Sequence, residues 1–66
     1  MEPRVYKGYE INVSTQEVFN NGESLFDVVI IKIETKDIVF QYTCRRTPYV
    51  MFEEARKKIN NVLAHN

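Results

Sequence analysis

The 66-residue sequence has few residues that can form covalent or metal cross-links, with one cysteine, one histidine and no tryptophan. A single cysteine cannot form an internal disulfide, and one cysteine with one histidine cannot supply the four ligands of a structural zinc site. We therefore expect no metal and no cofactor. A domain of this size buries only about 60% of the surface of its unfolded chain, so its core has little reinforcement.

An excess of charge of one sign is also lacking, because nine Lys and Arg residues balance nine Asp and Glu residues. A net charge of zero gives no overall field that would draw the protein to nucleic acid or to an anionic membrane. The longest apolar run, Val28–Ile31, is far shorter than the ~20 residues that span a bilayer, and no secretory signal is apparent. We expect a single domain over residues 1–66, with no membrane association and, given the unpaired cysteine, a cytoplasmic location.

Alternating apolar and polar residues predict three β-strands before the C-terminal part of the chain. The predicted strands run from about Arg4 to about Thr15 or as far as Phe19, from about Leu25 to Glu34, and from Ile38 to Cys44. Asn21 and Gly22 are typical of a tight hairpin turn, because both residues tolerate a positive φ. A polar turn over residues 35–37 separates the second and third strands.

Thr47 and Pro48 predict the start of a helix, since threonine is a common N-cap and proline fits the first helical position. Apolar residues then recur at helical spacing up to a predicted end near Ala64. This stripe consists of Phe52, Ala55, Ile59, Val62 and Leu63. The sequence thus predicts an α+β fold of βββα type, in which a three-stranded antiparallel meander is followed by one C-terminal α-helix packed on one face.

Loop lengths decide which residues of the sheet face the helix. A two-residue loop at 21–22 places Val13 opposite Ile30, and a three-residue loop at 35–37 places Ile30 opposite Tyr42. The helix-facing side of the sheet then contains Ile11, Val13, Phe26, Val28, Ile30, Ile38, Phe40, Tyr42 and Cys44. The other side retains four β-branched aliphatic residues, Val29, Ile31, Ile33 and Val39.

This second set of aliphatic residues is the main functional signal. A patch of this kind normally marks an interface, and a second copy of the chain would bury it and enlarge a small core. We therefore expect a small cytosolic interaction or regulatory module that associates as a homodimer, or with another protein partner, through Val29, Ile31, Ile33 and Val39. The alternative is that strand propensity alone favours valine and isoleucine at these positions.

A second hypothesis is nucleic-acid binding at the start of the helix. Residues 45–58 contain five basic and two acidic residues, a local excess of three positive charges. Phosphate groups favour such clusters and helix N-termini. The candidate contacts are Arg45, Arg46, Arg56, Lys57 and Lys58. The same residues also fit a solvated basic corner that balances an acidic sheet.

Cys44 is the residue that comes nearest to a catalytic candidate. Its neighbours Arg45 and Arg46 favour a thiolate, whereas its place in the alternation with Tyr42 favours a buried and unreactive thiol. The two glycines are isolated, so no phosphate-binding loop is present, and no nucleophile is paired with a base. We therefore expect no enzymatic activity and no catalytic residues.

The predicted order of three antiparallel strands and one helix resembles the DNA-binding arm domains of some phage-type integrases, which place the sheet in the major groove. This resemblance would imply basic and polar side chains on the exposed face of the sheet. Here that face carries the four aliphatic residues beside Glu10 and Asn12. The resemblance therefore extends to architecture alone, and we assign no family.

Overall fold

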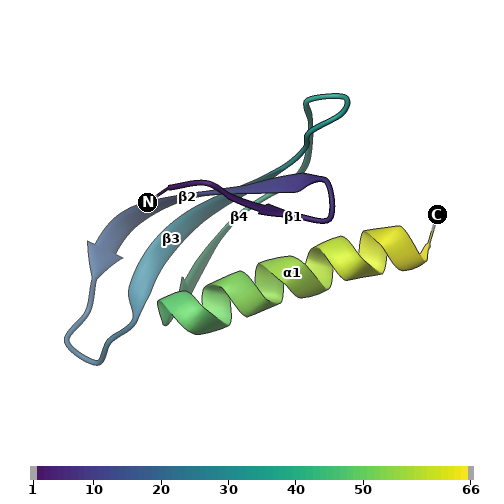
Figure 1. Ribbon diagram of the computed structural model, residues 1–66. Coiled ribbons are helices and arrows are strands. Elements are labelled where there is room, and N and C mark those ends of the chain that lie inside the picture. The colour runs from purple at the N-terminus through teal and green to yellow at the C-terminus, as the bar shows by residue number, and fades with distance from the viewer. Residues whose placement is uncertain (1, 66) are drawn as a thin grey trace.

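The chain folds into an antiparallel β-sheet with one helix across one of its faces, as seen in a computed structural model that describes residues 2–65 (Figure 1). The elements are β1 (Arg4–Tyr6), β2 (Tyr9–Val18), β3 (Ser24–Lys32), β4 (Asp37–Arg46) and α1 (Pro48–Ala64). The four strands lie in the order β1-β2-β3-β4, so each pairs only with its neighbours in sequence. The α+β class, the antiparallel sheet and the C-terminal helix are confirmed, but the prediction of three strands is wrong.

The additional strand arises from a chain reversal at Lys7 and Gly8, inside the segment expected to form one strand. Both residues have positive φ, 49° and 83°, as in the type I′ turn that joins tightly paired antiparallel strands. Tyr6 pairs with Tyr9 across the turn. Lysine is not a typical residue of such turns, so Gly8 was the one local sign of the reversal.

The pairing of β2 with β3 is displaced by two residues from the predicted register. Val13 lies opposite Val28 instead of Ile30. The connection is longer than expected, because Phe19 N donates to Glu23 O at 2.9 Å and residues 19–23 form the loop. Gln16 adds a second displacement as the extra residue of a β-bulge. Two single-residue displacements preserve parity, so the side chains of β2 face the predicted sides.

The pairing of β3 with β4 contains a bulge that does change the faces. Lys32 pairs with Asp37, and Lys36 N donates to Lys32 O at 2.7 Å, so residues 33–36 form the turn. Val39 is then the extra residue, because Ile31 pairs with Ile38 and Ile30 with Phe40, not with Tyr42. The predicted sides of Ile38 and Val39 are therefore both wrong, because the two residues have exchanged faces. Ile38 lies on the outer side of the sheet with Ile31, whereas Val39 packs against the core.

The helix begins where the sequence predicts. Thr47 has extended backbone angles, and its hydroxyl accepts a hydrogen bond from Val50 N at 3.5 Å, while Pro48 occupies the first turn. One stripe of α1 is buried against one side of the sheet, which Figure 1 shows as two layers. The core consists of Tyr9, Ile11, Val13, Phe26, Val28, Ile30, Met51, Phe52, Ala55 and Ile59.

Candidate interaction surface

A row of side chains crosses all four strands on the side of the sheet that faces away from α1. Val5 pairs with Glu10, Glu10 with Ile31, and Ile31 with Ile38. Directly opposite residues in antiparallel strands project to the same face, so these four side chains are neighbours. Val5 and Ile38 are 68% and 58% exposed, and Ile31 is half-buried. The row therefore presents three aliphatic side chains and one carboxylate.

Val29 extends this row along β3, and Ile33 continues it into the turn that follows the strand. Val29 is half-buried between Asn12 and Gln41, and Ile33, the first residue of the turn, is 43% exposed. We give the name outer patch to five aliphatic residues at one end of this face, Val5, Val29, Ile31, Ile33 and Ile38. Of the four predicted interface residues, the structure places Val29, Ile31 and Ile33 in the outer patch but not Val39.

Sequence reasoning missed Val5 and Ile38 as members of the outer patch. Val5 joins it only because the chain reverses at Lys7 and Gly8, which brings β1 alongside β2. Ile38 joins it only because Val39 is bulged. Gly8 was an available signal for the first of these features, whereas the alternation of residues 38–44 gave none for the second.

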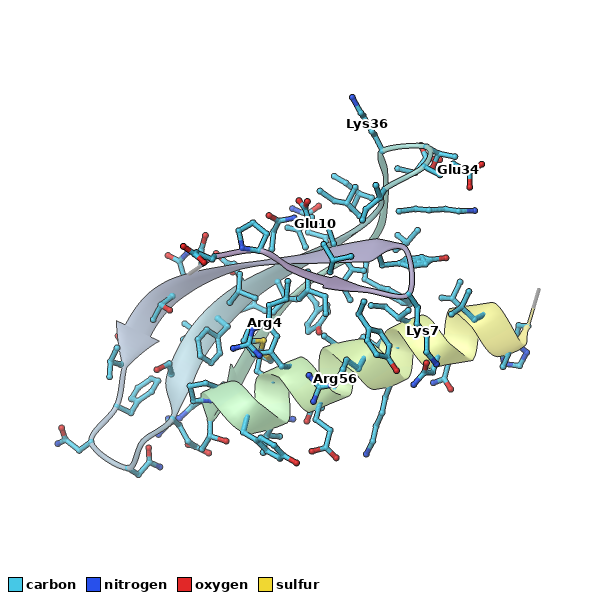
Figure 2. The ribbon with its side chains drawn as sticks, in the orientation of Figure 1. Arg4, Lys7, Glu10, Glu34, Lys36 and Arg56 are labelled. Carbon is cyan, nitrogen blue, oxygen red and sulfur yellow. The ribbon has the colours of Figure 1, made fainter. Side chains whose placement is uncertain are left out.

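The outer patch contains a hollow of about 320 Å³ lined by Glu10, Ile31, Ile33 and Lys36. Glu10 accepts a hydrogen bond from Asn12 Nδ2 at 2.8 Å. Figure 2 shows Glu10 on the side of the sheet away from the helix and Lys36 at the tip of the β3–β4 turn. The hollow thus has aliphatic walls and one charged group of each sign at its margin.

The other half of the outer face, towards the β2–β3 loop, is polar apart from the half-buried Leu25, which lies opposite Arg45. Asp27 accepts hydrogen bonds from Gln16 Nε2 at 2.6 Å and from Thr43 Oγ1 at 2.8 Å. Ser14 lies beside Asp27 in the adjacent strand. The outer face therefore has an aliphatic half and a polar half, and the polar half already satisfies its carboxylate.

The basic corner at the end of β4 is held by carboxylates. Arg45 Nε lies 3.1 Å from Glu23 Oε1, and its guanidinium stacks 3.7 Å from the centroid of the Phe19 ring. Arg46 Nε lies 2.9 Å from Glu54 Oε1, and this contact raises the pKa of Arg46. Both arginines are thus engaged in contacts within the protein, although they remain partly exposed.

The other three residues of the predicted basic site diverge. Lys57 Nζ lies 3.9 Å from Glu53 Oε1, and Lys58 Nζ lies 4.9 Å from the centroid of the Tyr42 ring, on the β4 side. Arg56 lies towards β1, where Figure 2 shows it with Arg4. Arg45 and Arg46, as successive residues of β4, project to opposite faces of the sheet, so the structure does not gather the five basic residues into one surface.

Cys44 lies on the helix-facing side of the sheet, opposite Phe26, and is half-buried. Burial raises the pKa of its thiol, and the Glu54 carboxylate raises it further. Arg46 acts in the opposite direction but does not reverse the shift. At neutral pH the thiol is therefore protonated and a poor nucleophile.

No protein-family model, curated protein or solved structure matches this chain. Within the described part of the chain, no helix has both the length and the apolar character that are needed to cross a membrane. No group of three or more His, Cys, Asp or Glu residues among residues 2–65 is arranged to hold a metal ion. The arguments about function therefore rest on the surfaces themselves.

Proposed function

We propose that the protein is a small interaction module that self-associates by packing the outer patch of one copy against the outer patch of a second. The observation that supports this proposal is the row Val5, Glu10, Ile31 and Ile38, which spans the sheet on the face opposite α1 and is aliphatic at three of its four positions. Clustered aliphatic surface is costly to expose to water and normally marks a contact with another molecule. A two-fold axis brings identical surfaces together, so one patch per copy is sufficient.

The shape of the outer patch supports the same arrangement. Ile38 is 58% exposed, and the hollow beside Glu10 and Ile31 measures about 320 Å³. In a face-to-face pair of sheets, side chains from the two inner faces interdigitate. Ile38 of each copy then fills the hollow of the other. Lys36, at the margin of that hollow, stays at the edge of the interface, where its ammonium group remains hydrated.

The expected association is reversible. Val29 and Ile31 are already half-buried in a single copy, so pairing removes only part of their surface from water. Glu10 also lies in the row, and covering its carboxylate carries a desolvation cost. Association further costs translational and rotational freedom. We therefore expect a dimer with a dissociation constant in the micromolar range.

Analytical ultracentrifugation tests the proposal with Ile31→Lys and Ile38→Lys. A lysine at either position places a charge in the apolar contact, so both variants should sediment as monomers at concentrations where the wild type is a dimer. Ile38→Lys is the sharper test, because that side chain is already 58% exposed and its replacement leaves the core intact. Circular dichroism should show an unchanged fold.

Thr43→Lys serves as the matched control, because Thr43 lies on the same strand and the same face but in the polar half. This variant should dimerise as the wild type does. A wild-type protein that stays monomeric at millimolar concentration would contradict self-association. Equal loss of dimer in Thr43→Lys and Ile38→Lys would show that the contact does not use the outer patch.

A further inference from the structure

A second hollow, of about 340 Å³, lies on the flank of the molecule between β1 and the first half of α1. Its lining consists of Arg4, Pro48, Tyr49, Phe52 and Arg56. Figure 2 shows Arg4 and Arg56 approaching each other from the strand and the helix. We call this site the Arg4–Arg56 hollow. Its volume is at the lower end of the range for sites that hold small ligands.

Arg4 is held in a defined orientation by an aromatic ring. It projects from β1, opposite Ile11, and its guanidinium carbon lies 3.9 Å from the centroid of the Phe52 ring. Phe52 is only 3% exposed and belongs to the core, so the exposed arginine lies over a ring that is fixed in place. Stacking on a ring occupies the face of a guanidinium and leaves its in-plane N–H groups free to bind an anion.

The helix supplies the rest of the site from a single row of side chains along its length. Tyr49, Phe52 and Arg56 are three and four residues apart in turn, so they lie on the same side of α1, towards β1. Asn60 continues this row, where its Oδ1 accepts hydrogen bonds from Tyr6 Oη at 3.2 Å and Lys7 Nζ at 2.9 Å. These bonds hold the β1–β2 turn against the helix and so fix the separation of the two walls.

The arginines of this flank differ from those at the end of β4 in having no acidic partner. Within residues 2–65, no carboxylate lies within ion-pair distance of Arg4, Lys7 or Arg56, whereas Arg45 and Arg46 each contact one. The flank is therefore locally basic in a protein that is neutral overall.

We propose that the Arg4–Arg56 hollow binds single-stranded nucleic acid, with a phosphate between the two guanidiniums and a base stacked on Tyr49. Paired guanidiniums are well suited to phosphate oxygens, which they bind through several N–H groups at once. The Tyr49 side chain is 72% exposed and stands beside Pro48 at the margin of the hollow. An acidic peptide would use the arginines but would not need this ring, whereas every base has a face that stacks on it.

This proposal is independent of the outer patch, because the hollow lies on the helix side of the sheet. It also relocates the nucleic-acid hypothesis that the sequence suggested at residues 45–58. Of the five basic residues in that hypothesis, the hollow retains only Arg56 and adds Arg4 from the other end of the sequence. A single stacking ring and two arginines predict weak binding that is sensitive to salt and tolerant of sequence.

Fluorescence polarisation of a labelled oligothymidylate, titrated with the full chain at low salt, tests the site. We expect Arg4→Gln and Arg56→Gln to weaken binding about tenfold each, and Tyr49→Ser about fivefold or more. Each arginine variant should also reduce the slope of log K against log salt concentration by about one. Arg4→Lys keeps the positive charge but replaces the planar guanidinium, with its several N–H donors, by a single ammonium group. This variant should therefore bind less tightly than the wild type.

Lys57→Gln is the control, because it removes one positive charge from the same helix outside the hollow. Its affinity should stay within about twofold of the wild type. Absence of any polarisation change at low salt, or equal weakening by Lys57→Gln and Arg56→Gln, would overturn the proposal. Tighter binding of an acidic or phosphorylated peptide than of the oligonucleotide would overturn it as well. Circular dichroism of each variant distinguishes lost contacts from lost folding.

Discussion

Ile31 of β3 lies directly opposite Ile38 of β4, whereas the preceding residue, Ile30, lies opposite Phe40. The one residue between these pairs, Val39, has no partner and forms a bulge. As a result, Val39 turns towards the core and Ile38 turns outwards, where it completes the aliphatic row. A single extra residue in β4 thus determines that Ile38, and not Val39, is available for contact with a second molecule.

Val39→Ala and Ile38→Ala should have unequal effects on stability. Val39 packs against the core, so its truncation should lower the free energy of unfolding by about 1 kcal/mol. Ile38 is 58% exposed, and its truncation should change that free energy by no more than about 0.5 kcal/mol. Urea denaturation at a concentration that favours the monomer measures both. A larger loss in Ile38→Ala would contradict the position of the bulge.

Gly8→Ala tests the turn that creates β1. Gly8 has a φ of 83°, and no atom lies within 4 Å of the position that a Cβ would occupy. The cost of the substitution is therefore conformational, and we expect a loss of about 1 kcal/mol in the free energy of unfolding. Gly8→Asn should lose less, because asparagine adopts a positive φ more readily. Equal losses in thermal or chemical denaturation would argue against a left-handed residue at this position.

Tyr42→Phe should stabilise the protein. The buried Tyr42 hydroxyl has no hydrogen-bond partner among residues 2–65, so its removal avoids an uncompensated desolvation cost and should add up to about 1 kcal/mol at neutral pH. Chemical denaturation of the two proteins side by side measures this difference. A destabilised Tyr42→Phe would show that the hydroxyl has a partner.

The same pair of proteins should also differ in alkaline solution. Burial raises the pKa of Tyr42 to about 12 from an ordinary value of 10.0. Because the folded state keeps this proton to higher pH than the unfolded state, the wild type loses stability as the pH rises from about 10 to about 12. Tyr42→Phe should lose less stability over that range, and a pH series of unfolding curves would show the difference. Parallel pH dependence in the two proteins would contradict the raised pKa.

Cys44 should react slowly with alkylating reagents while the protein is folded. Burial and the Glu54 carboxylate both raise the pKa of the thiol, so the reactive thiolate is scarce near neutral pH. We expect iodoacetamide to modify the folded protein about tenfold more slowly than the protein in denaturant, as followed by mass spectrometry. Rapid modification of the folded chain would instead support a nucleophilic role.

Local signals in the sequence predicted the helix and the general character of the strands. Thr47 and Pro48 marked the helix start because capping depends on a few adjacent residues. The covered face of β2 was predicted correctly even though its register was not, because the longer loop and the bulge at Gln16 together shift the pairing by an even number of residues. Alternation fixes parity in a strand, and parity survives such a shift.

The features that the sequence did not disclose depend on single backbone positions. Lys7 adopts a positive φ although lysine carries no sign of it, and Val39 is bulged within an alternation that otherwise continues. The first error left Val5 out of the outer patch, and the second put Val39 there in place of Ile38. Arg4 was also unrecognised as a functional candidate, since its contact with Phe52 joins segments from the two ends of the sequence.

The hydrogen bond from Tyr6 Oη to Asn60 Oδ1 links residues 54 positions apart, whereas each pair of adjacent strands is joined by a short connection. Short loops close rapidly and with little loss of entropy, so the hairpins of β2, β3 and β4 should form early in folding. The seam between β1 and α1 should then close last and open first. Because the Arg4–Arg56 hollow is lined by residues of both β1 and α1, a ligand bound there would hold the two elements together. It would therefore slow the first step of unfolding.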